Sequence, residues 1–228
     1  MTAAGGRRTR VAMALAGGVG LVLLAALPPH LPAYVVIVLT ECLIYAVAAG
    51  SLDLLIGYTG LASLGHSAFF AVGAYTTALL ATRSTASFAA TLAASVLLAA
   101  VVSAVIAVLA LRASGLYFMM ITLSVAMCAW GLAYRWVSLT GGDTGIVGIP
   151  KPRLGLGWLA GGGLEFYYAT LGLFVACLAL YLLVVASPFG KTLVGIRDSE
   201  SRMRVLGFNV WLHKYLALII AGAFAGLA

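Results

Sequence analysis

Long, uninterrupted runs of apolar residues dominate this sequence, and short polar segments separate them. A helix needs about 20 mostly apolar residues to cross a bilayer, and six runs approach or reach that length. These runs cover residues 11–27, 33–56, 64–82, 88–111, 116–137 and 166–186. They lack the polar alternation of a membrane-spanning β-barrel, so their backbone must form helices. The sequence therefore predicts an all-α fold, a polytopic transmembrane helical bundle.

The composition excludes the soluble classes of protein. Of the 228 residues, 64% are hydrophobic and only 8% are charged, whereas a soluble domain is about half apolar and a quarter charged. So few charges could not form a water-facing shell around a core. A soluble enzyme, a nucleic-acid-binding module and a disordered chain are therefore excluded.

A seventh apolar run extends from Tyr215 to the last residue, Ala228. Its 14 residues are too few to cross a hydrocarbon layer about 30 Å thick at 1.5 Å per residue. We interpret this run as a partial seventh span. We therefore expect the protein to be truncated at its carboxyl terminus.

The basic residues predict how the chain is oriented. The net charge is +7, and cytoplasmic loops of membrane proteins collect Lys and Arg. A cytoplasmic amino terminus leaves only four basic residues outside: Arg83, Arg135, Lys151 and Arg153. We expect residues 1–10 to be a basic cytoplasmic terminus and residues 11–228 to form one transmembrane domain. Within that domain we expect an outer loop at 138–165 and a cytoplasmic segment at 187–214.

The predicted cytoplasmic segment combines charge with helical periodicity. An apolar stripe recurs at helical spacing, and two acid-before-base pairs, Asp198 with Arg202 and Glu200 with Arg204, are four residues apart. That spacing stabilises an exposed helix, and Gly207 is placed to end it. The pattern predicts one short helix from about Thr192. From the residues alone, this helix could lie on the membrane surface or dock a cytoplasmic partner.

Polar residues interrupt the second run and the stretch that follows it. Glu41 and Asp53 lie inside the run, and carboxylates at membrane depth usually mark function. The glycine- and hydroxyl-rich residues 57–67 include Ser63 and His66. Such a stretch is either an interrupted helix of the kind that transporters place at substrate sites or an ordinary turn. These four side chains are candidate pathway or gating residues; for His66 we favour a hydrogen-bonded packing role.

The sequence contains no convincing motif for catalysis or cofactor binding. Gly190-Lys191-Thr192 matches the end of a P-loop, but Val185 stands where its first glycine is required. The cysteines at 42, 128 and 177 are too far apart for a metal site or a disulfide framework. We therefore predict no catalytic residue, no metal and no bound cofactor. Any energy from ATP must come from partner subunits.

Several separated motifs resemble one family of transporters. The resemblance is carried, in order, by Gly57–Leu61, Ser63–His66, Gly73–Thr76, Gly115–Phe118, Thr122-Leu123, Leu139–Gly142, Gly145–Pro150, Ser187–Gly190, Ile196–Asp198, Glu200 and Leu206-Gly207. In this order they are similar to the permease subunits of branched-chain amino-acid ABC importers. Asp53 departs from the pattern, because the family often has Asn there. Family members also continue through further spans after Gly226.

The resemblance implies that this chain is one of two permease subunits that together form a channel in a bacterial inner membrane. Its partners would be a sister permease, two cytoplasmic ATPase subunits that use ATP, and a periplasmic substrate-binding protein. The charged helix would then be the coupling helix that fits a groove in the ATPase. The residues implied in ATPase coupling are Arg197, Asp198, Glu200, Arg204 and Gly207.

The leading hypothesis is thus an ABC permease subunit for branched-chain or other hydrophobic amino acids, and not an enzyme. One alternative is the same machine importing urea or short amides. Another is an ion-coupled secondary transporter that uses Glu41 and Asp53. A third is a structural subunit that does not transport.

Overall fold

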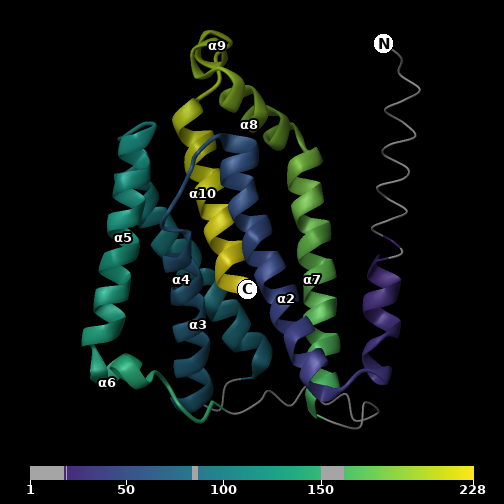
Figure 1. Ribbon diagram of the computed structural model, residues 1–228. Helices are drawn as coiled ribbons and strands as arrows, with labels where there is room; N and C mark the ends of the chain where they lie inside the picture. Colours follow the sequence, from purple (N-terminus) through teal and green to yellow (C-terminus); the bar gives the residue numbers. More distant parts are fainter. Residues whose placement is uncertain (1–17, 19, 84–86, 150–161) are drawn as a thin grey trace. The chain divides into compact units, whose positions relative to one another are not determined.

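The computed structural model describes residue 18 and residues 20–83, 87–149 and 162–228 (Figure 1). No strand occurs within these ranges, which confirms the all-α prediction. The longer helices are α2 (Ala33–Asp53), α3 (His66–Arg83), α4 (Phe88–Ala110), α5 (Leu116–Arg135), α7 (Gly162–Ala186) and α10 (Val210–Leu227). The shorter helices are α6 (Val137–Thr140), α8 (Pro188–Asp198) and α9 (Glu200–Val205), with 3₁₀ turns at Pro28–His30 and Gly142–Thr144 and a π-helix at Leu54–Thr59.

Three expectations fall partly or wholly outside the described residues. The basic terminus at 1–10 lies outside them, and so do residues 11–17 and 19 of the first apolar run at 11–27. The expected outer loop at 138–165 is described up to residue 149 and again from residue 162. Its first part contains α6 and a 3₁₀ turn.

Five helices in the described part of the chain are long and apolar enough to cross a membrane. They are Ala33–Thr59, Phe88–Ala110, Leu116–Arg135, Gly163–Ala186 and Val210–Leu227. The third predicted run forms α3, but α3 is not among the five, because its histidine, arginine and hydroxyl residues lower its hydropathy. The chain is nevertheless a multi-pass helical membrane protein.

The last helix begins earlier than the sequence suggested. We expected the run to begin at Tyr215, but α10 begins at Val210 and has 18 residues. Asn209 determines this start, because its side chain accepts a hydrogen bond from the Leu212 N–H at 3.1 Å. The expected length of 14 residues is therefore wrong: His213 and Lys214 belong to the first turns of α10 rather than to the preceding segment.

The chain divides into two compact units, with boundaries inside α2 and α7. The first contains residues 1–43 and 153–173, and the second contains residues 44–152 and 174–228. In the first unit, the Tyr167 hydroxyl donates to the Leu24 carbonyl at 2.8 Å, and the Tyr168 hydroxyl donates to the Ala25 carbonyl at 3.0 Å. These bonds join α7 to the chain segment before α2.

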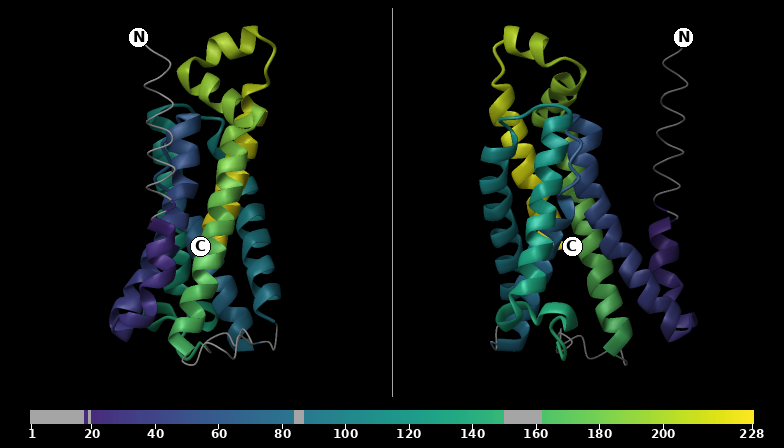
Figure 2. Two further views of the ribbon diagram at one scale, coloured as in Figure 1. Left: turned by 90° about the vertical axis from the view of Figure 1, so that its right-hand side faces the viewer. Right: turned by 60° about the vertical axis from the view of Figure 1, so that its left-hand side comes forward.

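Small residues form the core of the second unit, where α3, α4 and α10 pack side by side (Figures 1 and 2). A Cβ added at Gly73 of α3 would lie 2.8 Å from the Gly226 Cα of α10. A Cβ at Gly222 of α10 would overlap Ser103 of α4, which is fully buried. Small residues let membrane helices approach closely, because lipid offers no hydrophobic driving force between them.

Large apolar side chains lie on the outside of the helices. They include Leu97 and Val105 on α4, Met120 and Trp130 on α5, and Leu183 on α7, each at least 60% exposed. Such surfaces are unfavourable in water but suit contact with lipid tails or another apolar protein surface. The structure thus agrees with the exclusion of a soluble protein.

Candidate functional site

The predicted cytoplasmic segment contains α8 and α9, which together we call the coupling segment (Pro188–Val205). Ser187 caps α8, because its hydroxyl accepts the Gly190 N–H at 3.3 Å, and Pro188 occupies the first turn. Pro188 and Gly190 therefore begin a new helix directly after α7 ends at Ala186. Gly190 permits the sharp turn, because a Cβ there would overlap the Val185 carbonyl oxygen.

Ser199 breaks the coupling segment into two helices, whereas the sequence suggested one. Its backbone is extended, with φ −165° and ψ 105°, and its hydroxyl faces the Arg202 N–H that opens α9. Asp198 and Arg202 consequently lie on different helices, and the predicted pair between them is not formed. Asp198 instead lies 3.3 Å from Arg197.

Glu200 connects α9 to α10. It forms the predicted pair with Arg204 at 3.3 Å and a second ion pair with Lys214, whose side chain is only 12% exposed. The Lys214 contact was not predicted, because 14 residues and a turn separate it from Glu200. Glu200 therefore orients α9 on the first turns of α10.

Gly207 ends α9, as its position in the sequence suggested. It has φ +86°, and its N–H bonds to the Arg204 carbonyl at 3.0 Å while the Phe208 N–H bonds to the Met203 carbonyl at 3.1 Å. This pair of bonds is a Schellman motif, which requires left-handed backbone at the residue after the helix. Glycine adopts that conformation without steric cost.

Arg197 joins the coupling segment to the end of α2. Its Nη1 donates to the Gly57 carbonyl at 2.5 Å, and a Cβ at Gly60 would lie 2.9 Å from the Arg197 Cγ. Beneath this contact Leu193 of α8 is fully buried, in one core cluster with Leu54 and Leu55. The buried stripe of α8 therefore faces protein, whereas the charged residues of the segment face outward.

The glycine-rich stretch after α2 is not a simple turn. The helix first widens into the π-helix Leu54–Thr59, Gly60 turns the chain with φ +73°, and non-helical backbone leads to His66. Gly65 packs against the Thr122 backbone of α5, where a Cβ would overlap its carbonyl oxygen. The sequence signalled irregular backbone here but not a π-helix.

His66 and Ser51 form a buried polar pair. The Ser51 hydroxyl lies 2.6 Å from His66 Nε2, and the His66 ring meets Phe69 edge-on with centroids 5.6 Å apart. His66 Nδ1 has no partner in the described part of the chain. Of the other candidate residues, Ser63 is buried and Glu41 is exposed on α2 in the first unit; neither joins this pair.

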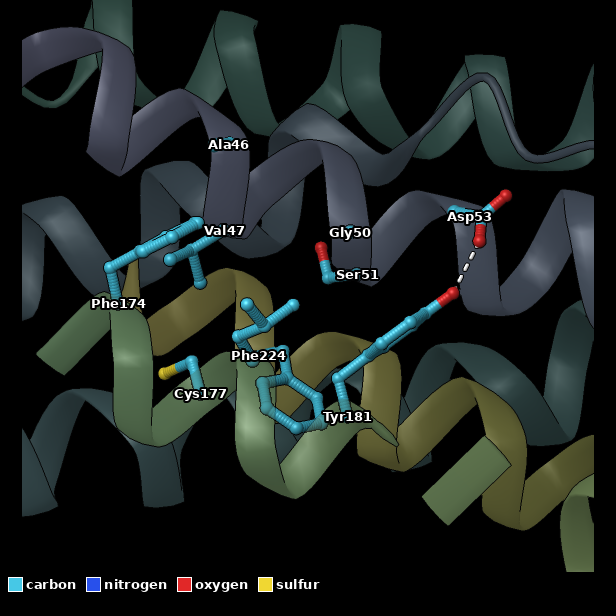
Figure 3. A pocket seen from close by; sticks show the side chains of 10 residues that line it. Ala46, Val47, Gly50, Ser51, Asp53, Phe174, Cys177, Tyr181 and Phe224 are labelled. Atoms are coloured by element: carbon cyan, nitrogen blue, oxygen red, sulfur yellow. Dashed lines mark hydrogen bonds between the residues drawn. The ribbon is translucent and has the colours of Figure 1, made fainter. Parts of the chain in front are cut away.

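A cavity of about 180 Å³ lies in the second unit, between α2, α7 and α10 (Figure 3). Its walls are mostly apolar, and Asp53 lies at one end, where it accepts a hydrogen bond from the Tyr181 hydroxyl. Ser51 also lines the cavity, so the buried Ser51–His66 pair adjoins the cavity wall. The lining residues are Ala46, Val47, Gly50, Ser51, Asp53, Phe174, Cys177, Leu178, Tyr181 and Phe224.

Sequence reasoning identified Asp53 but missed Tyr181 and the rest of the cavity. In the sequence, Tyr181 is simply a tyrosine inside an apolar run. Such a tyrosine is as typical of helix packing as of a functional site. The described residues contain no group of three His, Cys, Asp or Glu side chains that could hold a metal ion. The second unit thus combines a charged coupling segment with an apolar cavity that carries one carboxylate.

Comparison with known proteins identifies the family. Residues 34–228 match the family model described as the permease component of branched-chain amino acid transport systems. The high-affinity branched-chain amino acid transport system permease protein LivM of Escherichia coli (strain K12) is 31% identical over 230 residues, covering 91% of this chain and 54% of that protein. LivM of Salmonella typhimurium (strain LT2) is 30% identical over 211 residues, covering 83% of this chain and 50% of that protein.

The chain thus spans about half the length of the curated relatives it matches. No solved structure matches it. The family match covers the π-helix, the cavity and the coupling segment alike. The chain belongs to the family of permease components of branched-chain amino acid transport systems.

Proposed function

We propose that this chain is a transmembrane permease subunit of an ATP-binding-cassette importer for branched-chain or other hydrophobic amino acids. The observation that carries the proposal is the coupling segment. The apolar residues Leu193 and Ile196 of α8 are buried inside the protein, whereas Asp198 and Arg204 are exposed together with a single apolar residue of α9, Val205. A helix that lay on lipid would need its apolar face outward. Docking on a protein partner therefore explains the segment better than lipid binding.

The relatives' names supply the rest of the proposed assembly. They are permease proteins of high-affinity branched-chain amino acid transport systems. We infer that this chain likewise pairs with a sister permease, two cytoplasmic ATPase subunits and an extracytoplasmic substrate-binding protein. ATP is used by the ATPase subunits, and this chain binds no cofactor.

We also propose how this chain is oriented in the membrane and how many times it crosses it. Residues 11–27 and α3 would cross the membrane in addition to the five apolar helices, which gives six spans before the coupling segment and α10 after it. α3 tolerates its polar residues, because α4 and α10 pack against it. The amino terminus would lie on the cytoplasmic side of a bacterial inner membrane. Six spans then return the chain to that side, so the coupling segment would lie in the cytoplasm with the ATPases.

A mechanical path supports the coupling role. Closure of the ATPases on ATP would move the coupling segment, and helix shifts of this kind are common in switching transitions. Arg197 and buried Leu193 would transmit that movement to the π-helix at the end of α2. The π-helix directly follows Asp53, so the movement would reach the mouth of the cavity.

Reversing the charge of Glu200 tests this proposal. In Glu200→Arg, α9 loses both its ion pairs and its acidic surface, so we expect ATPase copurification and ATP-dependent leucine uptake each to fall by about tenfold, a difference of about 1.4 kcal/mol. Asp143→Arg is the matched control, because Asp143 lies in the expected outer loop. Undiminished ATPase assembly and uptake in Glu200→Arg would exclude the coupling role, provided that gel filtration shows an intact protein.

A further inference from the structure

We propose that the cavity between α2, α7 and α10 binds an aliphatic molecule that carries an ammonium group. The Asp53 carboxylate would face the ammonium, and the apolar wall would face the alkyl chain. This inference rests on the proposed function and deepens it, because it places a binding site for the transported amino acid inside this subunit.

The walls of the cavity suit a small alkyl group. Val47 from α2, Phe174 and Leu178 from α7 and Phe224 from α10 surround it. An apolar cavity of about 150 Å³ is enough to hold benzene, and this one has about 180 Å³. A branched side chain of four carbons has fewer carbons than benzene and fits that space.

The negative charge of Asp53 at the end of the cavity is suited to binding a cation. Asp53 accepts a hydrogen bond from Tyr181, which is a neutral donor, and it forms no ion pair with any residue that the structure describes. Arg197 packs on the adjoining π-helix but donates to the Gly57 carbonyl and to Asp198 instead. Asp53 is exposed at the end of the cavity, so a ligand in the cavity can reach its carboxylate. A ligand ammonium would supply the missing partner.

The backbone around Asp53 is shaped to make room for its carboxylate. A Cβ at Gly57 would overlap Asp53 Oδ1, so the glycine provides space for this side chain. The π-helix begins at the next residue, Leu54, and π-helical turns inside α-helices are frequent at functional sites. Figure 3 shows one carboxylate oxygen facing Tyr181 and the other turned away from it. An ammonium group in the cavity would therefore bind the oxygen that already accepts from the Tyr181 hydroxyl.

The same chemistry separates two candidate substrate classes. Urea carries neither a cationic group nor an alkyl chain, and a short aliphatic amide carries no cationic group, so the carboxylate would not be used. Leucine, isoleucine and valine use both the carboxylate and the apolar wall. The cavity therefore favours branched-chain amino acids over urea as cargo.

Cys177 provides a direct reporter, because it lines the cavity and is only 4% exposed, while Cys42 and Cys128 are exposed elsewhere. The full chain carrying Cys42→Ala and Cys128→Ala would be placed in lipid nanodiscs and treated with uncharged methyl methanethiosulfonate. Leucine and isoamylamine at about ten times their dissociation constants should slow Cys177 modification by about tenfold. Isocaproate, which has the alkyl chain without the ammonium, and urea should not protect it.

Variants of the same chain test the role of the charge. Asp53→Asn should abolish protection by leucine and isoamylamine while leaving the unprotected rate of modification unchanged, which shows that the cavity is still folded. Tyr181→Phe keeps the carboxylate and should keep the protection, as should the matched control Asp143→Asn. The inference is overturned if isocaproate protects as well as isoamylamine, if no ligand protects, or if Asp53→Asn protects normally.

Uptake by the assembled transporter distinguishes this inference from the proposed function. ATP-dependent leucine uptake without Asp53-dependent protection would overturn the cavity site and leave the permease function standing. Asp53-dependent protection together with uptake that needs no ATPase would overturn the permease function and support the site.

Discussion

At the scale of single residues, Gly73 shows how closely the helices of the second unit approach. Its Cα faces the Gly226 backbone of α10, and Gly226 in turn faces Ala99 of α4. The resemblance to known permeases drew attention to Gly73, but periodicity alone gives no sign of its partner. The contact depends on where two distant helices cross, which local patterns do not encode.

We expect Gly73→Ala to destabilise the protein by about 1–3 kcal/mol, because the added methyl group forces α3 away from α10. Thermal unfolding of the purified chain in detergent measures the effect. Gly131→Ala is the matched control in α5, where a Cβ meets nothing within 4 Å. That change should be neutral or stabilise the helix by about 0.5–1 kcal/mol. Equal loss of stability in both variants would argue against the close packing of α3 and α10.

The candidate site was partly predictable at this scale. Asp53 and His66 could be identified because polar residues in apolar runs are conspicuous. Ser51 and Tyr181 could not, because their partners are 15 and 128 residues away in the chain. A serine or tyrosine in a membrane helix gains significance only from the neighbour that the fold provides.

At the scale of elements, Arg197 holds the coupling segment in contact with the π-helix. Charge spacing correctly predicted the Glu200–Arg204 pair and the helix end at Gly207. It wrongly predicted one continuous helix, because Ser199 serves as a cap with extended backbone. A serine side chain can bond to nearby backbone N–H groups and so interrupt a helix. The sequence does not indicate whether Ser199 continues the helix or caps a new one.

The Arg197 contact yields a prediction about energy transfer. Arg197→Ala removes the bond to the Gly57 carbonyl but leaves Glu200 and the remaining charged surface in place. A hydrogen bond made by a charged group contributes about 1.5–3 kcal/mol, and less where the group is exposed, so we expect ATP-dependent uptake to fall roughly fivefold while ATPase copurification persists. Arg112→Ala, an exposed arginine after α4, serves as the control. Loss of ATPase binding in parallel with uptake would show that Arg197 acts in docking instead.

At the scale of the whole molecule, apolar run length predicted the helices well and their boundaries less well. All the apolar runs that lie within the described residues are helices. α10 begins five residues before its apolar run, because a membrane helix can carry His213 and Lys214 in its first turns where they reach polar partners. The third apolar run forms α3, which is less apolar than the five helices that could cross a membrane.

The proposed orientation predicts which loops are reachable from outside the cell. A cysteine at the position of Asp143 should react with a membrane-impermeant maleimide in intact cells. A cysteine at the position of Ser201 in α9 should react only after the membrane is permeabilised. Both positions are exposed in the structure, so access depends on the side of the membrane. The reverse pattern of labelling would invert the assigned orientation.

We propose above all that this chain belongs to an importer driven by ATP. This proposal is tested most directly by leucine uptake into sealed vesicles that contain the complete transporter, measured with and without ATP and with a protonophore. We predict uptake that requires hydrolysable ATP and continues when the proton gradient is abolished. Uptake that persists without the ATPases and stops with the protonophore would contradict the account and identify an ion-coupled transporter.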